Sequence, residues 1–217
     1  MLTSRTPIYF CAMVSFLDDG PPDAPATLLL AHGAGGAMDS SFLNTIAQGL
    51  AARGVGVRRF EFPYMAARRT EGRNRPPDRE PVLLDTWRAA VKETGKPVFI
   101  GGKSMGGRMA SLVADELGVR GLVCLGYPFH PPGQPDRLRT RHLQNLRTPT
   151  LIVQGERDPF GTREDVARYT LSKAIRLEWL PDGDHSFKPR KASGATEAGH
   201  LARAVEVVGE FLAAKGL

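Results

Sequence analysis

The stretch Pro97-Val-Phe-Ile-Gly-Gly-Lys-Ser104-Met-Gly-Gly107 decides the fold. Residues Pro97–Gly101 form an apolar run that predicts a strand, and Met105–Leu117 has the apolar spacing of a helix. The pattern Gly-x-Ser-x-Gly between them places Ser104 on a turn so sharp that its neighbours must lack bulky side chains. We expect the Ser104 hydroxyl to be an exposed nucleophile, with the Met105 N–H as an oxyanion donor. The alternative is a glycine-rich turn without chemistry, because this pattern alone is common by chance.

Short apolar runs and helical periods alternate along the rest of the chain. Further strands are expected at Ile8–Leu17, Thr27–Ala31, Val55–Phe60, Val119–Leu125, Thr150–Gln154 and Ile175–Leu180. Helices are expected over about Phe42–Arg53, Val82–Thr94 and Asp136–Leu146, after a capping box at Thr162–Asp165, and along the face Leu201, Val205, Val208 and Leu212. Residues 63–81 are polar and rich in arginine, which predicts an exposed connection. The alternation indicates an α/β fold with a mostly parallel central sheet and helices on both faces.

The composition is that of one globular domain spanning residues 1–217. Apolar residues make up 41% of the 217 residues and charged residues 24%, which argues against disordered, fibrous or disulfide-scaffold proteins. No apolar run approaches the roughly 20 residues of a membrane span. Cys11 and Cys124 both lie in apolar runs, as buried reduced thiols of a cytoplasmic protein would. The connection between the loop Gly126–Gly133 and the next expected helix is short and leaves no room for a separate lid domain, so we expect an open site.

A serine nucleophile needs a base and an acid that orients the base. Asp158 follows the strand at 150–154, and His185 lies in a loop between the next strand and the last helix. The order serine, acid, histidine along the chain is the one found in enzymes that have this kind of turn. We therefore expect Ser104, Asp158 and His185 to form a catalytic triad. Glu156 is the second choice for the acid, and Asp184 ranks behind it, because it adjoins His185 in sequence.

A second oxyanion donor should come from the loop after the strand at 27–31. His32-Gly-Ala-Gly-Gly36 lies there, and we expect the Ala34 N–H to be the donor, with Gly35 as the alternative. His32 itself is expected to be a buried structural residue. The proline-rich loop Gly126–Gly133 should border the site. The sequence predicts a substrate pocket formed by Gly35, Tyr127, Phe129 and His130.

Motifs for nucleotides and metals fail on inspection. The first glycine of a P-loop ending at Ser104 would fall on Pro97, and the third glycine of a dinucleotide fingerprint would fall on Met38. No cysteine or histidine spacing suits a metal. We therefore expect neither a cofactor nor a metal.

Basic residues form two groups in the sequence. The net charge is +6, and arginines cluster at positions 68, 69, 73, 75 and 79 and again at positions 137, 139, 141 and 147. They form either a solvated basic face or a site for an acidic substrate or partner. Nucleic acid is not expected, since no aromatic residues interleave with the charges. Homodimerisation is open, because an exposed edge at the N-terminal strand could pair with a second copy.

The chain resembles the α/β-hydrolase superfamily over nearly its whole length. Four stretches carry the resemblance: His32–Gly36, Gly101–Arg108, Gly126–Gly133 and Gln154–Gly161. It looks like the small hydrolases related to dienelactone hydrolase, and within these it is most similar to the branch containing the testis-expressed hydrolase-like protein and the NSL histone-acetyltransferase complex subunit. The resemblance implies the triad of Ser104, Asp158 and His185, with backbone donors from Met105 and the Ala34 region.

The likeness leaves the substrate open. Dienelactone hydrolases proper use a cysteine where this chain has Ser104. That difference favours hydrolysis of a small-molecule ester or thioester over dienelactone ring opening. We expect a serine hydrolase of the carboxylesterase kind. The alternative is a hydrolase-fold interaction module without turnover, although an intact triad argues against it.

Overall fold

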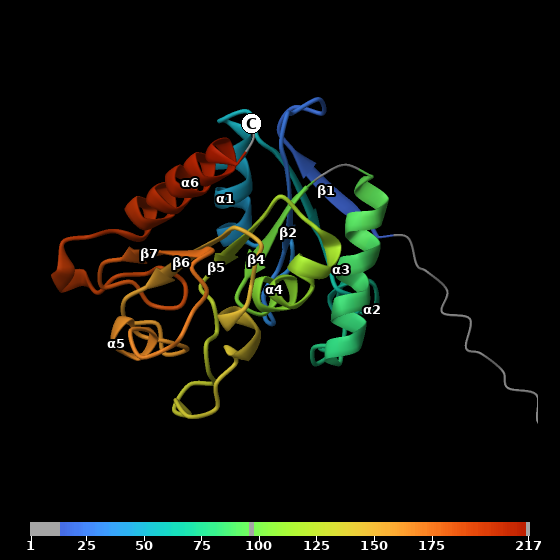
Figure 1. Ribbon diagram of the computed structural model, residues 1–217. Coiled ribbons are helices and arrows are strands. Elements are labelled where there is room, and N and C mark those ends of the chain that lie inside the picture. Colours follow the sequence, from blue (N-terminus) through green and yellow to red (C-terminus); the bar gives the residue numbers. More distant parts are fainter. Residues whose placement is uncertain (1–13, 96–97, 216–217) are drawn as a thin grey trace, which may run out of the picture.

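Strand β2 (Thr27–Ala31) sends alternate side chains into two separate cores. Leu28 and Leu30 belong to one buried cluster, and Leu29 and Ala31 belong to the other. A strand that is apolar on both faces must be covered on both faces, which is why the sequence reads as a continuous apolar run. The computed structural model describes residues 14–95 and 98–215 (Figure 1).

The described residues form one sheet of seven strands in the order β1-β3-β2-β4-β5-β6-β7. The other strands are β1 (Phe16–Asp19), β3 (Gly56–Phe60), β4 (Phe99–Lys103), β5 (Gly121–Leu125), β6 (Thr150–Gly155) and β7 (Ile175–Leu180). All neighbours pair in parallel except β1, which lies antiparallel to β3 at one edge. The predicted α/β architecture, a mostly parallel sheet in a single domain, is confirmed.

Helices cover both faces of this sheet. One layer holds α1 (Ser41–Ala51) and α6 (Glu197–Ala214), which lie side by side (Figure 1). The other holds α2 (Pro63–Glu71), α3 (Glu80–Thr94) and α4 (Met105–Leu117). A short helix, α5 (Arg163–Val166), begins at the predicted capping box, in which the Thr162 hydroxyl accepts from the Asp165 N–H. No helix in the described part of the chain combines the length and apolar character needed to cross a bilayer.

Two predicted segments are wrong. Residues 63–81 are not only an exposed connection, because α2 begins at Pro63 and buries Tyr64 and Met65. Proline suits the first turn of a helix. Because only two residues of this helix face inward and arginines follow them, the sequence shows no clear apolar face. The expected helix Asp136–Leu146 is reduced to a single 3₁₀ turn, Arg141–Gln144. The backbone of Arg139 bonds instead to the neighbouring loop, through Phe129 O and the Tyr127 hydroxyl.

The structure describes only part of the expected N-terminal strand. The expected strand Ile8–Leu17 falls largely on residues outside the described part, as does Cys11, whereas β1 itself begins at Phe16. Strand β1 lies at the edge of the sheet, and pairing of this edge with a second copy stays a prediction. Cys124 is buried and free, and burial raises the pKa of its thiol, so the thiol stays protonated.

Candidate active site

Ser104 stands between the end of β4 and the start of α4. Its backbone has φ 51° and ψ −114°, a strained conformation for a residue with a side chain. The glycines beside it are required by close backbone approach: a Cβ on Gly106 would lie 2.5 Å from the His32 carbonyl oxygen, and a Cβ on Gly102 would lie 2.6 Å from the Gly106 carbonyl carbon. The strained turn of the motif is therefore present, and it sets Ser104 at the N-terminus of α4.

The structure brings Ser104, His185 and Asp158 together in one hydrogen-bonded chain. His185 Nε2 lies 2.8 Å from Ser104 Oγ, and His185 Nδ1 lies 2.7 Å from Asp158 Oδ2. The three residues follow β4, β7 and β6, whose carboxyl ends meet at the same edge of the sheet. Parallel pairing is what converts a separation of 81 residues between Ser104 and His185 into contact.

Asp158 is held in a fully buried position. Its Oδ2 also accepts from Gln154 Nε2 at 2.9 Å, and its Oδ1 accepts from the Phe160 N–H at 2.9 Å. These donors stabilise the ionised carboxylate and fix its orientation. The two rival acids are engaged elsewhere: Glu156 accepts from the Asp182 N–H, and Asp184 accepts from backbone N–H groups within its own loop.

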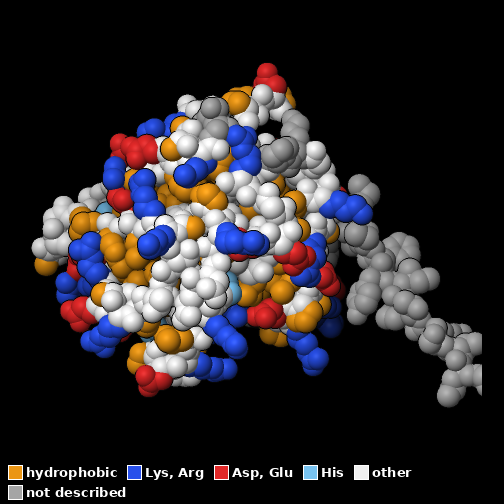
Figure 2. All heavy atoms as spheres, viewed as in Figure 1, with side chains coloured by type: hydrophobic (Ala, Val, Ile, Leu, Met, Phe, Trp, Pro, Cys, Tyr) orange, Lys and Arg blue, Asp and Glu red, His pale blue; other side chains and the backbone are white. Residues whose placement is uncertain are grey.

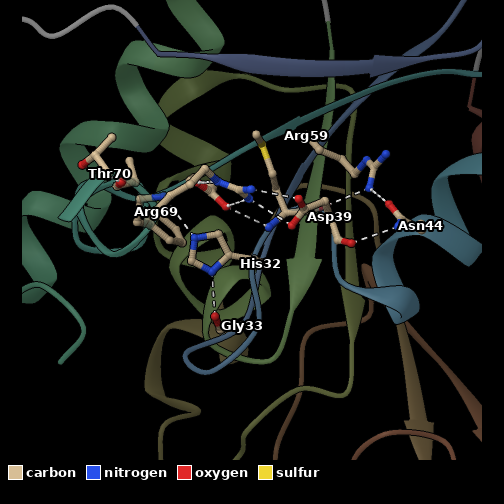
Figure 3. A network of polar contacts seen from close by, with 11 residues as sticks. His32, Gly33, Asp39, Asn44, Arg59, Arg69 and Thr70 are labelled. Carbon is tan, nitrogen blue, oxygen red and sulfur yellow. Dashed lines mark hydrogen bonds and ion pairs between the residues drawn. The ribbon is translucent and has the colours of Figure 1, made fainter. Parts of the chain in front are cut away.

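His32 anchors the loop that faces Ser104 (Figure 3). Its Nε2 accepts from the Phe62 N–H at 3.1 Å, so its proton resides on Nδ1, which donates to Gly33 O at 2.7 Å. Burial lowers the pKa of His32, in keeping with a neutral ring. The Tyr64 hydroxyl donates to Ala34 O at 2.9 Å and lies 3.3 Å from Gly33 O. His32 is thus a buried structural residue, as its place in the turn predicts.

These anchors orient the expected oxyanion donor. In a trans peptide the C=O and the N–H point in opposite directions, so a Gly33 carbonyl held by His32 and Tyr64 turns the Ala34 N–H away from both. The same argument applies to the Gly35 N–H, because Ala34 O is held by Tyr64. Neither N–H has a protein acceptor within residues 14–95 and 98–215. Ala34 and Ser104 line both hollows and Gly35 lines the larger one, so this loop lies beside the nucleophile.

Two buried or bridging arginines hold the next part of this loop from behind (Figure 3). Arg69 pairs with Asp39 at 2.9 Å and with Glu61 at 2.6 Å. Arg59, only 2% exposed, pairs with Asp19 and donates to Met38 O at 2.7 Å. At least one arginine of the first predicted cluster is therefore structural. Figure 2 shows basic and acidic side chains interspersed on the face viewed there, not gathered into one basic patch.

Ser104 lies where two surface hollows meet. The larger, of about 650 Å³, includes Gly35, Phe42, Lys103 and His185 among its lining residues. The smaller, of about 390 Å³, has lining residues that include Met105, Arg108, Pro128 and Arg139. Ala34, Ser104 and Phe160 line both hollows. A substrate carbonyl at Ser104 therefore has room for a group on each side.

The predicted pocket is mostly wrong. Gly35 lines the larger hollow, but Tyr127, Phe129 and His130 are buried and line neither hollow. The Tyr127 N–H donates to Gln154 Oε1 at 2.7 Å, and the Tyr127 and Phe129 rings pack together with centroids 4.8 Å apart. The aromatic residues of this loop point inward and support the site from below. Their sequence alone could not show this, because aromatic residues serve equally as core and as pocket wall.

Sequence reasoning missed other residues beside Ser104. Phe160 packs on His185, with ring centroids 4.3 Å apart. Lys103 Nζ donates to His185 O at 2.6 Å, and burial lowers the Lys103 pKa to about 8. Arg108 lies four residues after Ser104, within the motif that carries the resemblance. The signal for Lys103 and Arg108 was their position next to the nucleophile, one on each side of the turn.

Comparisons with known proteins show the family and the fold of this chain. The model of a family described as alpha/beta hydrolase domain matches residues 24–213. Est1E from Butyrivibrio proteoclasticus has a TM-score of 0.71 at 17% identity, covering 93% of this chain and 94% of that chain. A dienelactone hydrolase from Anabaena variabilis has a TM-score of 0.70 at 22% identity, covering 93% and 91%.

A third structure, XC6422 from Xanthomonas campestris, is described as a serine hydrolase without lid. It has a TM-score of 0.64 at 20% identity and covers 93% of this chain and 87% of that chain. At such identities the likeness to solved structures shows a shared fold. The family model, which spans most of the sequence, shows more: the chain belongs to the α/β-hydrolase family.

Proposed function

We propose that this protein is a serine hydrolase that cleaves small or medium carboxylic esters or thioesters through an acyl-enzyme. The single observation that carries the proposal is the unbroken hydrogen-bond chain from Ser104 through His185 to Asp158. Structural neighbours described as an esterase domain and as a monoacylglycerol lipase support the same class of reaction. This proposal also includes two finer points. One is the closer kinship to the branch containing the testis-expressed hydrolase-like protein and the NSL histone-acetyltransferase complex subunit, and the other is a cytoplasmic location.

The proton positions follow from the acceptors. Asp158 accepts from His185 Nδ1, which leaves Nε2 without a proton and able to accept from the Ser104 hydroxyl. As Ser104 Oγ attacks the carbonyl carbon, its proton passes to His185 Nε2, and Asp158 stabilises the imidazolium. The Met105 N–H and the Ala34 N–H donate to the oxyanion. His185 then protonates the leaving group.

The second half of the reaction uses the same groups in reverse. A water molecule gives its proton to His185 Nε2 and attacks the carbonyl carbon of the ester that joins Ser104 Oγ to the acyl group. Ser104 Oγ leaves with the proton that His185 returns, and the carboxylic acid is released. Ring packing of Phe160 against His185 keeps the imidazole in line through both halves.

A fluorophosphonate probe tests the nucleophile directly. We expect the folded wild-type protein to form an adduct on Ser104 that mass spectrometry locates, and Ser104→Ala to form none. Ser186→Ala is a matched control, because Ser186 also lines the larger hollow and should label like wild type after substitution. In a parallel assay with 4-nitrophenyl esters, Ser104→Ala should reduce kcat by about 10⁶-fold. A folded protein that does not label, or that labels elsewhere, would overturn the proposal and favour the interaction module.

A further inference from the structure

The two hollows differ in their access to the proton that the leaving group needs. That proton sits on His185 Nε2 after the attack, so the alcohol or thiol must depart on the side where His185 lies. His185 and Ser186 line the larger hollow, whereas neither lines the smaller one. The leaving group therefore belongs in the larger hollow, and the acyl part of the substrate belongs in the smaller hollow.

The smaller hollow is lined by two arginines, Arg108 and Arg139, of which only Arg108 forms an ion pair among the described residues. The Arg108 side chain is 24% exposed and donates through one terminal nitrogen to Glu80 at 2.9 Å, while its Nε is buried without a hydrogen-bond partner. The Arg139 guanidinium has no hydrogen bond or ion pair to any residue in the described part of the chain. Burial and the like charges of Arg108 and Arg137 lower the pKa of Arg139.

Two carboxylates also line this hollow, and both are already engaged. Glu80 accepts from Arg108, and Asp78 accepts from the Tyr64 N–H at 2.8 Å at the start of α2. Neither acid pairs with Arg139, on which the positive charges of Arg108 and Arg137 act. An anion that binds beside two like charges relieves the repulsion between them. Among the described residues that line this hollow, Arg139 is therefore the positive group that is left to bind an anionic ligand.

We propose that Arg139, beside Arg108, binds a carboxylate on the acyl part of the substrate, so that the protein prefers half-esters of short dicarboxylic acids over neutral esters. This inference rests on the proposed serine hydrolase function. Guanidinium groups suit this task, since their planar fork of N–H donors matches a carboxylate. A hollow of about 390 Å³ that begins at Ser104 and Met105 leaves room for a short dicarboxylate chain.

Paired substrates test the preference. 4-Nitrophenyl hemiglutarate and 4-nitrophenyl valerate have the same leaving group and a similar chain length, and they differ in the terminal carboxylate. We expect wild-type kcat/KM to be about 10- to 100-fold higher for the hemiglutarate, the value of a charge-assisted hydrogen bond in a partly desolvated site. In Arg139→Met the ratio of the two kcat/KM values should fall by about tenfold or more. Arg139→Lys should restore part of it.

Controls separate a local effect from general damage. The hydrogen bonds of Arg139 in the structure use its backbone, so Met at this position keeps the loop contacts with Phe129 and Tyr127. Arg141→Met removes an exposed arginine of the same basic group that lines neither hollow, and it should leave the ratio unchanged. Equal kcat/KM for both esters in the wild type, or a ratio that Arg139→Met does not change, would overturn the proposal.

A binding measurement separates failure of the inference from failure of the proposed function. Monomethyl glutarate should bind to Ser104→Ala, measured by calorimetry, and the additional substitution Arg139→Met should weaken binding by about tenfold. Fluorophosphonate labelling together with hydrolysis of both esters at equal rates would leave the hydrolase standing and refute the carboxylate site. Absence of labelling would refute the hydrolase, and binding of monomethyl glutarate that does not depend on Arg139 would then also refute the carboxylate site.

Discussion

Replacing Lys103 with methionine should change how the stability of the protein depends on pH. Lys103 Nζ donates to His185 O and lies 5.5 Å and 5.9 Å from the ring centroids of Phe42 and Phe187. It has no ion pair within the described residues, and the charges of Asp158 and Asp184 act on it only from a distance. Burial consequently dominates and lowers its pKa from 10.5 to about 8.

The sign follows from counting protons. Between pH 8 and 10.5 the unfolded chain holds the Lys103 proton more strongly than the folded chain does. The free energy of unfolding therefore rises with pH across that range. Below pH 8 the folded protein bears the full cost of burying the ammonium group. The difference between the two pKa values corresponds to about 3 kcal/mol. Lys103→Met removes this contribution, so wild type should gain about 3 kcal/mol relative to the variant between pH 7.5 and 10.5.

Urea unfolding at several pH values measures this difference. Titration of tyrosines and other lysines affects wild type and Lys103→Met alike, so it cancels in the comparison of the two proteins. Lys92→Met, at an exposed position on α3, is the control and should follow the wild-type pH dependence. Parallel curves for wild type and Lys103→Met, within about 0.5 kcal/mol, would show that the Lys103 pKa is not lowered by burial and would refute the reasoning.

Three further substitutions give clear expectations. Asp158→Asn should reduce kcat on 4-nitrophenyl acetate by about 10⁴-fold, because an amide cannot accept from both His185 and the Phe160 N–H and would hold the wrong His185 tautomer; a loss below tenfold would contradict this role. Gly106→Ala should destabilise the fold by about 2 kcal/mol or more, seen as a lower Tm, since the new Cβ would lie 2.5 Å from a backbone oxygen; an unchanged Tm would count against the close approach. Arg59→Met should cost about 3–5 kcal/mol in urea unfolding, because it leaves Asp19 without its partner in a largely buried position; a neutral effect would mean that water reaches that carboxylate.

The sheet and the reacting groups could be predicted from sequence because local patterns specify them. A parallel strand that is buried on both faces has a sequence that is a short apolar run. Strands β2, β5 and β6 are recognisable on that ground alone. The Gly-x-Ser-x-Gly turn is equally local, since its geometry depends on the absence of side chains at neighbouring positions. The chain order of Ser104, Asp158 and His185 then follows from strand order.

The residues that line the two hollows were mostly not predicted, because no local pattern specifies which way a loop side chain points. Tyr127 and Phe129 look like pocket residues in sequence, yet packing and the bond to Gln154 turn that loop inward. The helix α2 was missed for a related reason: only Tyr64 and Met65 of its nine residues are buried, and two arginines, Arg68 and Arg69, lie in its last turn. These were errors about the direction of side chains, which only the packed structure decides.

Arg108 and Arg139 show how the chemistry of the reaction and the choice of substrate are encoded differently. They come from α4 and from a loop 31 residues further along the chain, and they meet only because β5 carries the chain to the same edge of the sheet. A family can therefore keep its nucleophilic turn while loops beyond the strand ends alter the charge of the smaller hollow. On this view the ratio of half-ester to neutral ester hydrolysis should respond to substitutions at Arg108 and Arg139 far more than to changes elsewhere on the basic surface.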